Sequence, residues 1–316
     1  MKSWVKNLEH LKFEKGEYSQ YFQDQLLNYV FQNIDEKIFQ KFCVEFGYNE
    51  NKISNLANST DLIKNYNWDY IFFDAIYENN EDKIYKEFLT TENILSIFEK
   101  FNIPKRLGYI SIDIDSLDFW LFKELLGEYK PIIYSVEYNP QFPINCAITS
   151  TNNPNLVFQN DCAYGASLKA LNLLAEEFNY SLLWVVPTLD AFFIRSDVID
   201  DGTENISFPL KKFKSYTNLP NHPRLIDISG ERTKNFLDYE TLVSSNYDYS
   251  KSIKSAEKVV SKYLIGLGNL KTKFYRVRLY LRKILLKLLR SNKITKILFI
   301  KKILSKILSF INYFDY

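Results

Sequence analysis

The chain has 316 residues, of which 46% are hydrophobic and 16% aromatic, and its formal net charge at pH 7 is +2. This length allows one large domain with an appendage, and this composition can fill a sizeable core. The three cysteines, at positions 43, 146 and 162, are widely spaced and odd in number, which argues against a disulfide framework and a CxxC metal site.

The predicted elements alternate between helices and short apolar strands. A helix is predicted over 23–39, where apolar side chains recur at three- and four-residue intervals, and a first strand follows at 42–47. Further helices are predicted over 61–67, 91–101, 118–128 and 165–178, and further strands over 70–74, 109–115, 132–138, 181–186 and 191–194. This alternation indicates βαβ units in a mostly parallel sheet that ends in an antiparallel hairpin. Residues 197–249 are predicted to be irregular.

Two of these strands end in residues that suit ligand binding, because ligands bind at the carboxyl ends of parallel strands. Gly47 closes the first strand and lets a ligand approach the backbone, while Glu45 can accept a hydrogen bond from an ammonium group. Asp74 ends the second strand, where a carboxylate can bind both ribose hydroxyls of a nucleoside. An ordinary turn at Gly47 and a solvated acid at Asp74 are the alternatives.

Asp113, Asp115 and Asp118 form an acidic cluster at the end of the third predicted strand. Asp113 and Asp115 are expected on one side of that strand, with Asp118 on the turn after it. Carboxylates this close need a cation, a proton or hydrogen-bond donors. Cofactor contact, a general base and oxygen ligands for Mg²⁺ or Ca²⁺ are all open roles, and capping of the next helix is the structural alternative.

Several short motifs stand in a specific order between residues 18 and 197. They are Ser19-Gln20-Tyr21-Phe22-Gln23-Asp24, Val44-Glu45-Phe46-Gly47, Thr91-Glu92-Asn93-Ile94, Ser111-Ile112-Asp113-Ile114-Asp115 with Asp118-Phe119-Trp120, Val136-Glu137-Tyr138-Asn139, Tyr164-Gly165-Ala166-Ser167-Leu168 and Ala191-Phe192-Phe193-Ile194-Arg195. In this order and spacing the chain resembles the FkbM-like S-adenosylmethionine-dependent methyltransferases, a group often associated with bacterial surface-glycan biosynthesis such as that of capsule and lipopolysaccharide.

The resemblance implies a Rossmann-like class I methyltransferase sheet and S-adenosylmethionine as the cofactor. It implies cofactor contacts from a set of residues at the strand ends and the following loops: Glu45, Gly47, Asn49, Asp74, Glu92, Asn93 and Asp113. Asn49 lies close to the position where related proteins usually have a second glycine, and Asn tolerates left-handed backbone better than other non-glycine residues. Glu92 and Asn93 are implied to lie beside the adenine, which is compatible with Thr91 as a simple helix cap.

The predicted reaction is methyl transfer to a sugar hydroxyl of a surface-polysaccharide precursor, either free or nucleotide-linked. Asp115 is the candidate base or metal ligand, and Asp118 is a further catalytic candidate. His222 is the candidate if a histidine base is needed, although Pro220-Asn221-His222-Pro223 is typical of a turn. One alternative is methylation of a phosphate or phosphoramidate decoration. Another is a non-catalytic membrane-associated binding subunit, which the missing second glycine favours.

The C-terminal end is strongly basic. Residues 264–316 hold thirteen Lys or Arg and one acid, whereas the rest of the chain holds 27 basic and 37 acidic residues. Apolar residues repeat at helical spacing in this tail, which is typical of a basic amphipathic helix on an anionic membrane surface. Packing on its own domain or on a second copy in a homodimer is an alternative, and nucleic acid is less favoured because no known binding motif is present.

The sequence predicts three parts: a methyltransferase-like domain over 1–200, an irregular cap or linker over 201–250 and the helical tail over 251–316. No stretch approaches eighteen uncharged apolar residues, and residues 1–15 lack an uninterrupted apolar segment. Neither a transmembrane helix nor a signal peptide is therefore expected. The predicted location is the cytoplasm, with the tail holding the protein at the inner face of the membrane.

Overall fold

The structure is a computed structural model, and it describes residues 2–48, 50, 52–53, 57–156, 163–200, 210–217 and 232–265. Three of the sequence predictions fall outside these residues: the cofactor contact at Asn49, the base at His222 and the amphipathic tail beyond residue 265. Within the described part, no helix is both long enough and apolar enough to cross a bilayer.

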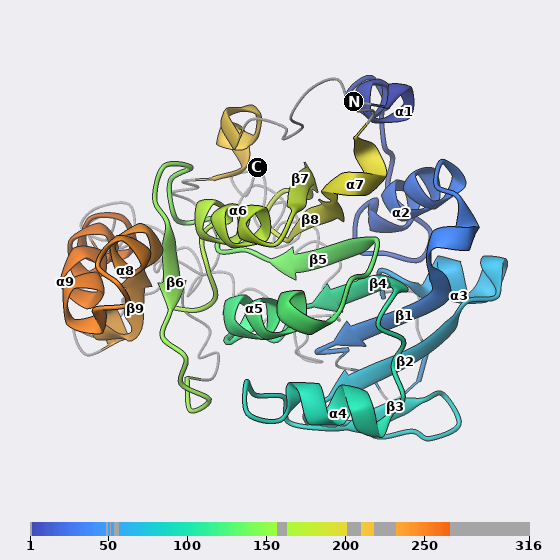
Figure 1. Cartoon of the computed structure of the whole chain (residues 1–316), viewed down its shortest axis with the longest axis horizontal. Helices are drawn as coiled ribbons and strands as arrows, with labels where there is room; N and C mark the ends of the chain where they lie inside the picture. Colours follow the sequence, from blue (N-terminus) through green and yellow to red (C-terminus); the bar gives the residue numbers. More distant parts are fainter. Residues whose placement is uncertain are drawn as a thin grey trace, which may run out of the picture.

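A seven-stranded sheet forms the centre of the molecule, with strand order β3-β2-β1-β4-β5-β8-β7 (Figure 1). The strands are β1 (Gln40–Phe46), β2 (Asp69–Asp74), β3 (Ile84–Lys86), β4 (Leu107–Ile112), β5 (Ile133–Glu137), β7 (Tyr180–Val185) and β8 (Asp190–Arg195). The first five in this order pair in parallel, and β8 pairs antiparallel with both β5 and β7. This confirms the predicted Rossmann-like α/β sheet with its antiparallel hairpin.

Five helices of the described residues pack beside this sheet. They are α2 (Gln23–Gln32), α3 (Thr60–Tyr66), α4 (Ile94–Lys100), α5 (Asp118–Glu128) and α6 (Leu168–Glu177), with short helices α1 (Ser3–Leu8) and α7 (Ser196–Ile199) near the end of the sheet. Contacts join α4 to α5 and α5 to α6, and α2 contacts α3 (Figure 1). The predicted helix over 23–39 is too long, because Asp35 caps a separate 3-10 turn at Glu36–Ile38 by accepting a hydrogen bond from the Lys37 N–H.

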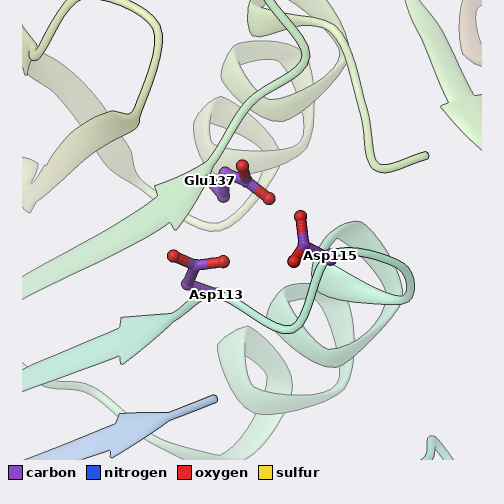
Figure 2. Close-up of side chains that lie close together, drawn as sticks. All are labelled: Asp113, Asp115 and Glu137. Carbon is purple, nitrogen blue, oxygen red and sulfur yellow. The ribbon is translucent and has the colours of Figure 1, made fainter. Parts of the chain in front are cut away.

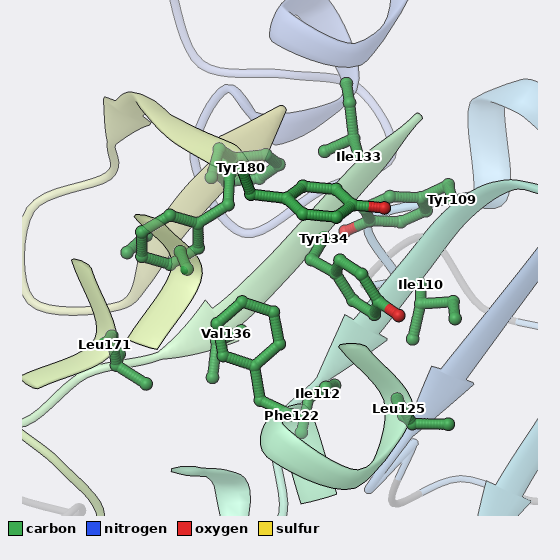
Figure 3. Close-up of a cluster of buried hydrophobic side chains, with 14 of the residues drawn as sticks. Tyr109, Ile110, Ile112, Phe122, Leu125, Ile133, Tyr134, Val136, Leu171 and Tyr180 are labelled. Atoms are coloured by element: carbon green, nitrogen blue, oxygen red, sulfur yellow. The ribbon is translucent and has the colours of Figure 1, made fainter. Parts of the chain in front are cut away.

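The core contains several tyrosines whose hydroxyl groups find hydrogen-bond partners inside the protein (Figure 3). Tyr180 Oη donates to the Pro131 carbonyl oxygen at 2.7 Å, and Tyr134 Oη donates to the Tyr129 carbonyl oxygen at 3.2 Å. A buried tyrosine adds a large apolar surface but leaves a costly polar atom unless that atom is bonded. The aromatic-rich sequence can therefore build a core around β4 and β5 in which the tyrosine hydroxyl groups are hydrogen-bonded.

A smaller two-stranded sheet lies beside the main sheet. It pairs β6 (Ile148–Ser150) antiparallel with β9 (Phe236–Asp238), which is followed by α8 (Tyr239–Ser244) and α9 (Tyr249–Val260). Phe142, Ile148, Phe236, Ala256 and Val260 form its apolar cluster. Residues 197–249 were predicted to be irregular, but they contain β9 and α8, whose short apolar stretches give little periodic signal. The division at residues 200 and 250 stays a prediction.

Candidate functional site

A pocket of about 390 Å³, here called the edge pocket, opens at the carboxyl ends of β1, β2 and β4. Its walls combine acids with apolar side chains, and the lining residues are Gly47, Phe73, Asp74, Ala75, Ile76, Glu87, Phe88, Leu89, Asp113, Ile114, Asp115, Ser116 and Leu117. Ile76 is 69% exposed and Phe88 53% exposed, so two large apolar side chains face solvent at this pocket. The predicted contacts Gly47, Asp74 and Asp113 are brought together here.

Gly47 lies where two loops touch. Its φ of +66° is in the left-handed region, and a Cβ atom at this position would be 1.8 Å from the backbone oxygen of Asp113. The Gly47 N–H donates to the carbonyl oxygen of Phe73 at 3.0 Å, which fixes the loop against β2. No side chain fits at this position, so the backbone is open to a ligand.

Asp74 is the last residue of β2, and its side chain is held in place by the following turn. Its Oδ1 atom accepts hydrogen bonds from the N–H groups of Ile76 at 2.6 Å and Tyr77 at 2.8 Å. These two bonds orient the carboxylate at the pocket wall. A fixed carboxylate at this edge has the geometry that ribose binding requires.

Asp113, Asp115 and Glu137 bring one carboxylate oxygen each to within 4.8 Å of one another (Figure 2). Glu137 is the last residue of β5 and is 4% exposed, whereas the two aspartates are partly buried. The expectation that both aspartates lie on one strand is wrong, because β4 ends at Ile112 and Asp115 has a φ of +57°. The loop backbone, not strand alternation, brings them together.

Asp118 is fully buried at the start of α5, directly after the loop that carries Asp115. Its Oδ1 atom accepts from the Ile114 N–H at 2.7 Å and its Oδ2 atom from the Ser116 N–H at 2.8 Å. Burial raises the pKa of Asp118 to about 7, the Asp115 charge adds to the rise, and the backbone N–H groups oppose it. The catalytic role of Asp118 stays a prediction, and its geometry suits holding the loop.

A second cavity, here called the polar well, adjoins the edge pocket and has a volume of about 80 Å³. Gly47 and Asp113 line both cavities, and the well also has Gln23, Asn58, Ser111, Leu189 and the acids Glu45 and Asp190 in its wall. Burial raises the pKa of Glu45 to about 8 and that of Asp190 to about 6. The Asp190 charge contributes to this rise at Glu45, while hydrogen bonds from Ser59 oppose it.

Two other predicted contacts lie outside both cavities. Glu92 is not part of either wall, and hydrogen bonds with Thr90 hold the pKa of its exposed carboxyl below the usual value. The Asn93 side chain donates to the Phe88 carbonyl oxygen at 2.8 Å and accepts from the Thr90 N–H at 2.8 Å. Asn93 thus shapes the loop that carries Phe88, and direct adenine contact by this pair stays a prediction.

The sequence interpretation did not assign a role to Glu137, Asp190 or Asn58. Asp190 begins β8, and because β8 is antiparallel its first residue lies at the edge where the parallel strands end, opposite Glu137. The sequence signal that could have identified Asp190 is its position directly before the predicted last strand of the hairpin. Asn58 comes from the loop before α3 and carried no comparable signal.

The charged side chains that line the two cavities, among the described residues, are all acidic. Among the described residues that line them, five are acids in addition to Asp113, namely Glu45, Asp74, Glu87, Asp115 and Asp190, and none is Lys, Arg or His. Closely placed carboxylates repel one another and favour protonation or a bound cation. The site therefore suits a ligand that carries positive charge and disfavours one that brings a pyrophosphate.

Comparisons with known proteins add little to this geometry. No protein-family model matches the chain, and no curated protein matches it. Two similar solved structures are crystal structures of the N-terminal domain of EvdMO1, one in the presence of SAH and D-fucose and one with SAH bound. The first is 10% identical over 61% of this chain and 94% of that chain, and the second is 9% identical over 60% and 93%. Both have a TM-score of 0.32, so the assignment of the site depends on its own residues.

Proposed function

We propose that this protein is an S-adenosylmethionine-dependent methyltransferase that methylates a hydroxyl oxygen. The observation that carries the proposal is the acidic edge pocket, which has apolar walls and, among the described residues that line it, no basic side chain. S-adenosylmethionine is a nucleoside that supplies an electrophilic methyl group on a positively charged sulfur. A dinucleotide would instead need donors for its pyrophosphate at this edge.

The lining residues offer a partner for the ribose, the adenine and the sulfur of this cofactor. Asp74 would hold the ribose hydroxyls, and the apolar side chains of Ile76 and Phe88 would contact the adenine. The bare backbone at Gly47 would allow the cofactor to approach where any Cβ would collide with Asp113. The acids beyond Gly47 would lie close to the positive sulfur.

Asp115 is the proposed general base. It lies at the edge pocket in a left-handed turn, on the loop that Asp118 holds with two hydrogen bonds. As the methyl group leaves sulfur and bonds to the acceptor oxygen, the acceptor proton would pass to the Asp115 carboxylate. Asp113 and Glu137 would keep the acceptor oriented or share a divalent cation with Asp115, since carboxylate oxygens are the ligands that Mg²⁺ and Ca²⁺ prefer.

The proposed acceptor is a sugar hydroxyl of a surface-polysaccharide precursor. The sugar assignment is supported by the resemblance of the sequence motifs to the FkbM-like family, and the hydroxyl by the charge of the site. A phosphate acceptor would bring negative charge to the cluster of Asp113, Asp115 and Glu137, which is unfavourable without a cation. A neutral hydroxyl avoids this repulsion.

Calorimetric titration of the full-length protein with S-adenosylmethionine tests the cofactor assignment. Asp74→Asn should weaken binding by about tenfold to 100-fold, because hydrogen bonds to a charged group contribute about 1.5–3 kcal/mol. Asp69→Asn is the matched control, since Asp69 begins the same strand, is exposed and lines neither cavity; its carboxylate pairs with Lys83 and accepts from the Tyr70 N–H. Equal affinity for wild type and Asp74→Asn would contradict the assignment, as would no binding by the wild-type protein.

Asp115→Asn tests the base in the same preparation. The variant should bind S-adenosylmethionine as tightly as wild type but transfer the methyl group to a sugar acceptor about 10²- to 10⁴-fold more slowly. An unchanged kcat in this variant would contradict the proposal that Asp115 is the general base.

A further inference from the structure

The outer face of α9 carries a row of exposed lysines, here called the lysine stripe. Its members recur at intervals of three or four residues from α9 into the helical turn that follows it (Ser261–Ile265), and they are Lys251, Lys254, Lys258 and Lys262. Residues three and four apart lie on the same side of a helix, so the four side chains share one face.

The opposite face of α9 is buried, which fixes the direction of the lysine stripe. Ser252, Ala256 and Val260 are fully buried, and the last two belong to the apolar cluster of β6 and β9. The Ser252 hydroxyl donates to the Asp238 carbonyl oxygen at 2.8 Å. Because this face is anchored to the fold, the lysines are held outward on a helix that is not free to turn.

Acids neutralise little of the lysine stripe within the described part of the chain. Lys251 pairs with Asp248 at 3.1 Å, and the other three lysines belong to none of the ion pairs between described residues. Glu257 is the one acid between residues 249 and 265. A row of positive charges that is not neutralised attracts an anionic surface.

Large hydrophobic side chains are exposed in the same layer of the molecule. Val243 in α8 is 42% exposed, and Tyr247 and Tyr249, just before and at the start of α9, are 45% and 47% exposed. The helices α8 and α9 lie side by side at one end of the molecule, beside the small sheet (Figure 1). Tyrosine suits a boundary between water and lipid, because its ring is apolar and its hydroxyl group is polar.

The chain that continues from the lysine stripe has the same sign of charge. Residues 264–316 hold thirteen Lys or Arg and one acid, and leucine and isoleucine alternate with these basic residues. Like charges repel, so neither this segment nor the same stripe on a second copy of the chain complements the lysine stripe. The complementary partner is an anionic surface from outside the protein.

We propose that the lysine stripe is a docking surface for a lipid bilayer that contains anionic phospholipid. The phosphate groups of such a bilayer complement the lysines, and its interface accepts the exposed aromatic and aliphatic side chains of the same layer. A duplex nucleic acid would also attract the lysines, but it offers no apolar layer to Val243 and Tyr247 or to the leucines and isoleucines of residues 264–316. The inference is independent of the cofactor and of the reaction.

Vesicle flotation of the full-length protein tests the docking surface. Vesicles of phosphatidylcholine alone are compared with vesicles that also contain phosphatidylglycerol, and wild type should bind only the second kind, more weakly as salt is raised. The triple variant Lys254→Gln, Lys258→Gln, Lys262→Gln should bind the anionic vesicles about 100-fold more weakly, because each basic side chain near an anionic surface strengthens binding by about fivefold.

The matched control removes the same charge elsewhere. Lys6→Gln, Lys37→Gln, Lys64→Gln changes three exposed lysines, on α1, on the 3-10 turn before β1 and on α3, toward the other end of the molecule (Figure 1). This control should bind the anionic vesicles as wild type does.

Three results would overturn the docking surface: wild type that does not prefer the anionic vesicles, equal binding by wild type and the α9 triple variant, or equal weakening by the two triple variants. If wild type binds duplex DNA more tightly than the anionic vesicles and the α9 variant loses that binding, the lysine stripe serves nucleic acid and the bilayer proposal fails. If the triple variant does not fold, Lys258→Gln decides, with binding about fivefold weaker expected and unchanged binding overturning the proposal.

Discussion

At the scale of single residues, the site depends on positions where only one residue type fits. Gly47 is the clearest, because its backbone is left-handed and a methyl group would overlap the Asp113 backbone oxygen. Asp118 is another, since both of its oxygens are needed to hold the loop that carries Asp115. Such residues act through backbone geometry and through the groups that they place.

Gly47→Ala should therefore abolish cofactor binding and lower the free energy of unfolding. The left-handed backbone alone accounts for about 1–3 kcal/mol, and the overlap with Asp113 adds to it. Denaturant unfolding and calorimetry measure the two effects. Gly127→Ala is the control, because nothing lies within 4 Å of a Cβ there and alanine should stabilise α5 by about 0.5–1 kcal/mol. Similar behaviour of the two variants would contradict this account of Gly47.

At the scale of elements, the sequence predicted most of the main sheet and the helices beside it, but not the small second sheet. The predicted helix over 118–128 agrees with α5, and every strand of the main sheet except β3 was predicted within a few residues. Continuous apolar runs and helical spacing carry this information. The strands β3, β6 and β9 have three residues each, which is too short for a period to be visible.

The sequence predicted only part of the site, because strand pairing and loop backbone bring some of its residues together. Asp74 and Gly47 follow strands directly, so their place at the carboxyl edge could be inferred from the order of the elements. The approach of Glu137 to Asp113 depends on the pairing of β5 with β4, which a sequence pattern does not reveal. The left-handed turn at Asp115 could not be read either, since aspartate adopts that backbone in only a minority of cases.

The small sheet of β6 and β9 should be a stability unit with its own core. Phe236 is 1% exposed, and its ring centre lies 5.7 Å from that of Phe142. Phe236→Ala should lower the free energy of unfolding by about 3–5 kcal/mol, as expected for loss of a buried phenylalanine. Val243→Ala on the neighbouring α8 is the control, because Val243 is 42% exposed. A loss under 1 kcal/mol in Phe236→Ala would show that this cluster does not support the fold.

At the scale of the whole molecule, three buried acids make stability depend on pH. The pKa is raised to about 8 for Glu45, about 7 for Asp118 and about 6 for Asp190, in each case chiefly by burial. Because the folded protein keeps protons that the unfolded chain has released, the free energy of unfolding should fall as the pH rises from about 4 to about 8. Below this window both states are protonated, and above it both are ionised.

Glu45→Gln isolates one of these groups without changing its shape. The variant cannot ionise at position 45, so the difference between its melting temperature and that of wild type should increase as the pH rises from 5 to 8. Each unit of pKa shift is equivalent to about 1.4 kcal/mol of stability. Thermal unfolding at a series of pH values measures the difference. The exposed Asp197→Asn variant should follow the wild-type curve. A constant difference between Glu45→Gln and wild type over this range would contradict a raised pKa at Glu45.

The contact between Gly47 and the Asp113 backbone has a consequence for the sequence of events in a reaction cycle. The backbone at Gly47 and the backbone oxygen of Asp113 lie so close that no Cβ atom fits between them, so a shift of one segment is expected to be felt by the other. Under the proposed function, a cofactor bound at Gly47 would also hold the Asp113 segment, and the acids Asp113 and Asp115 would then be in position before the acceptor arrives. The protein should therefore follow an ordered kinetic scheme, with the cofactor binding first and the demethylated cofactor leaving last.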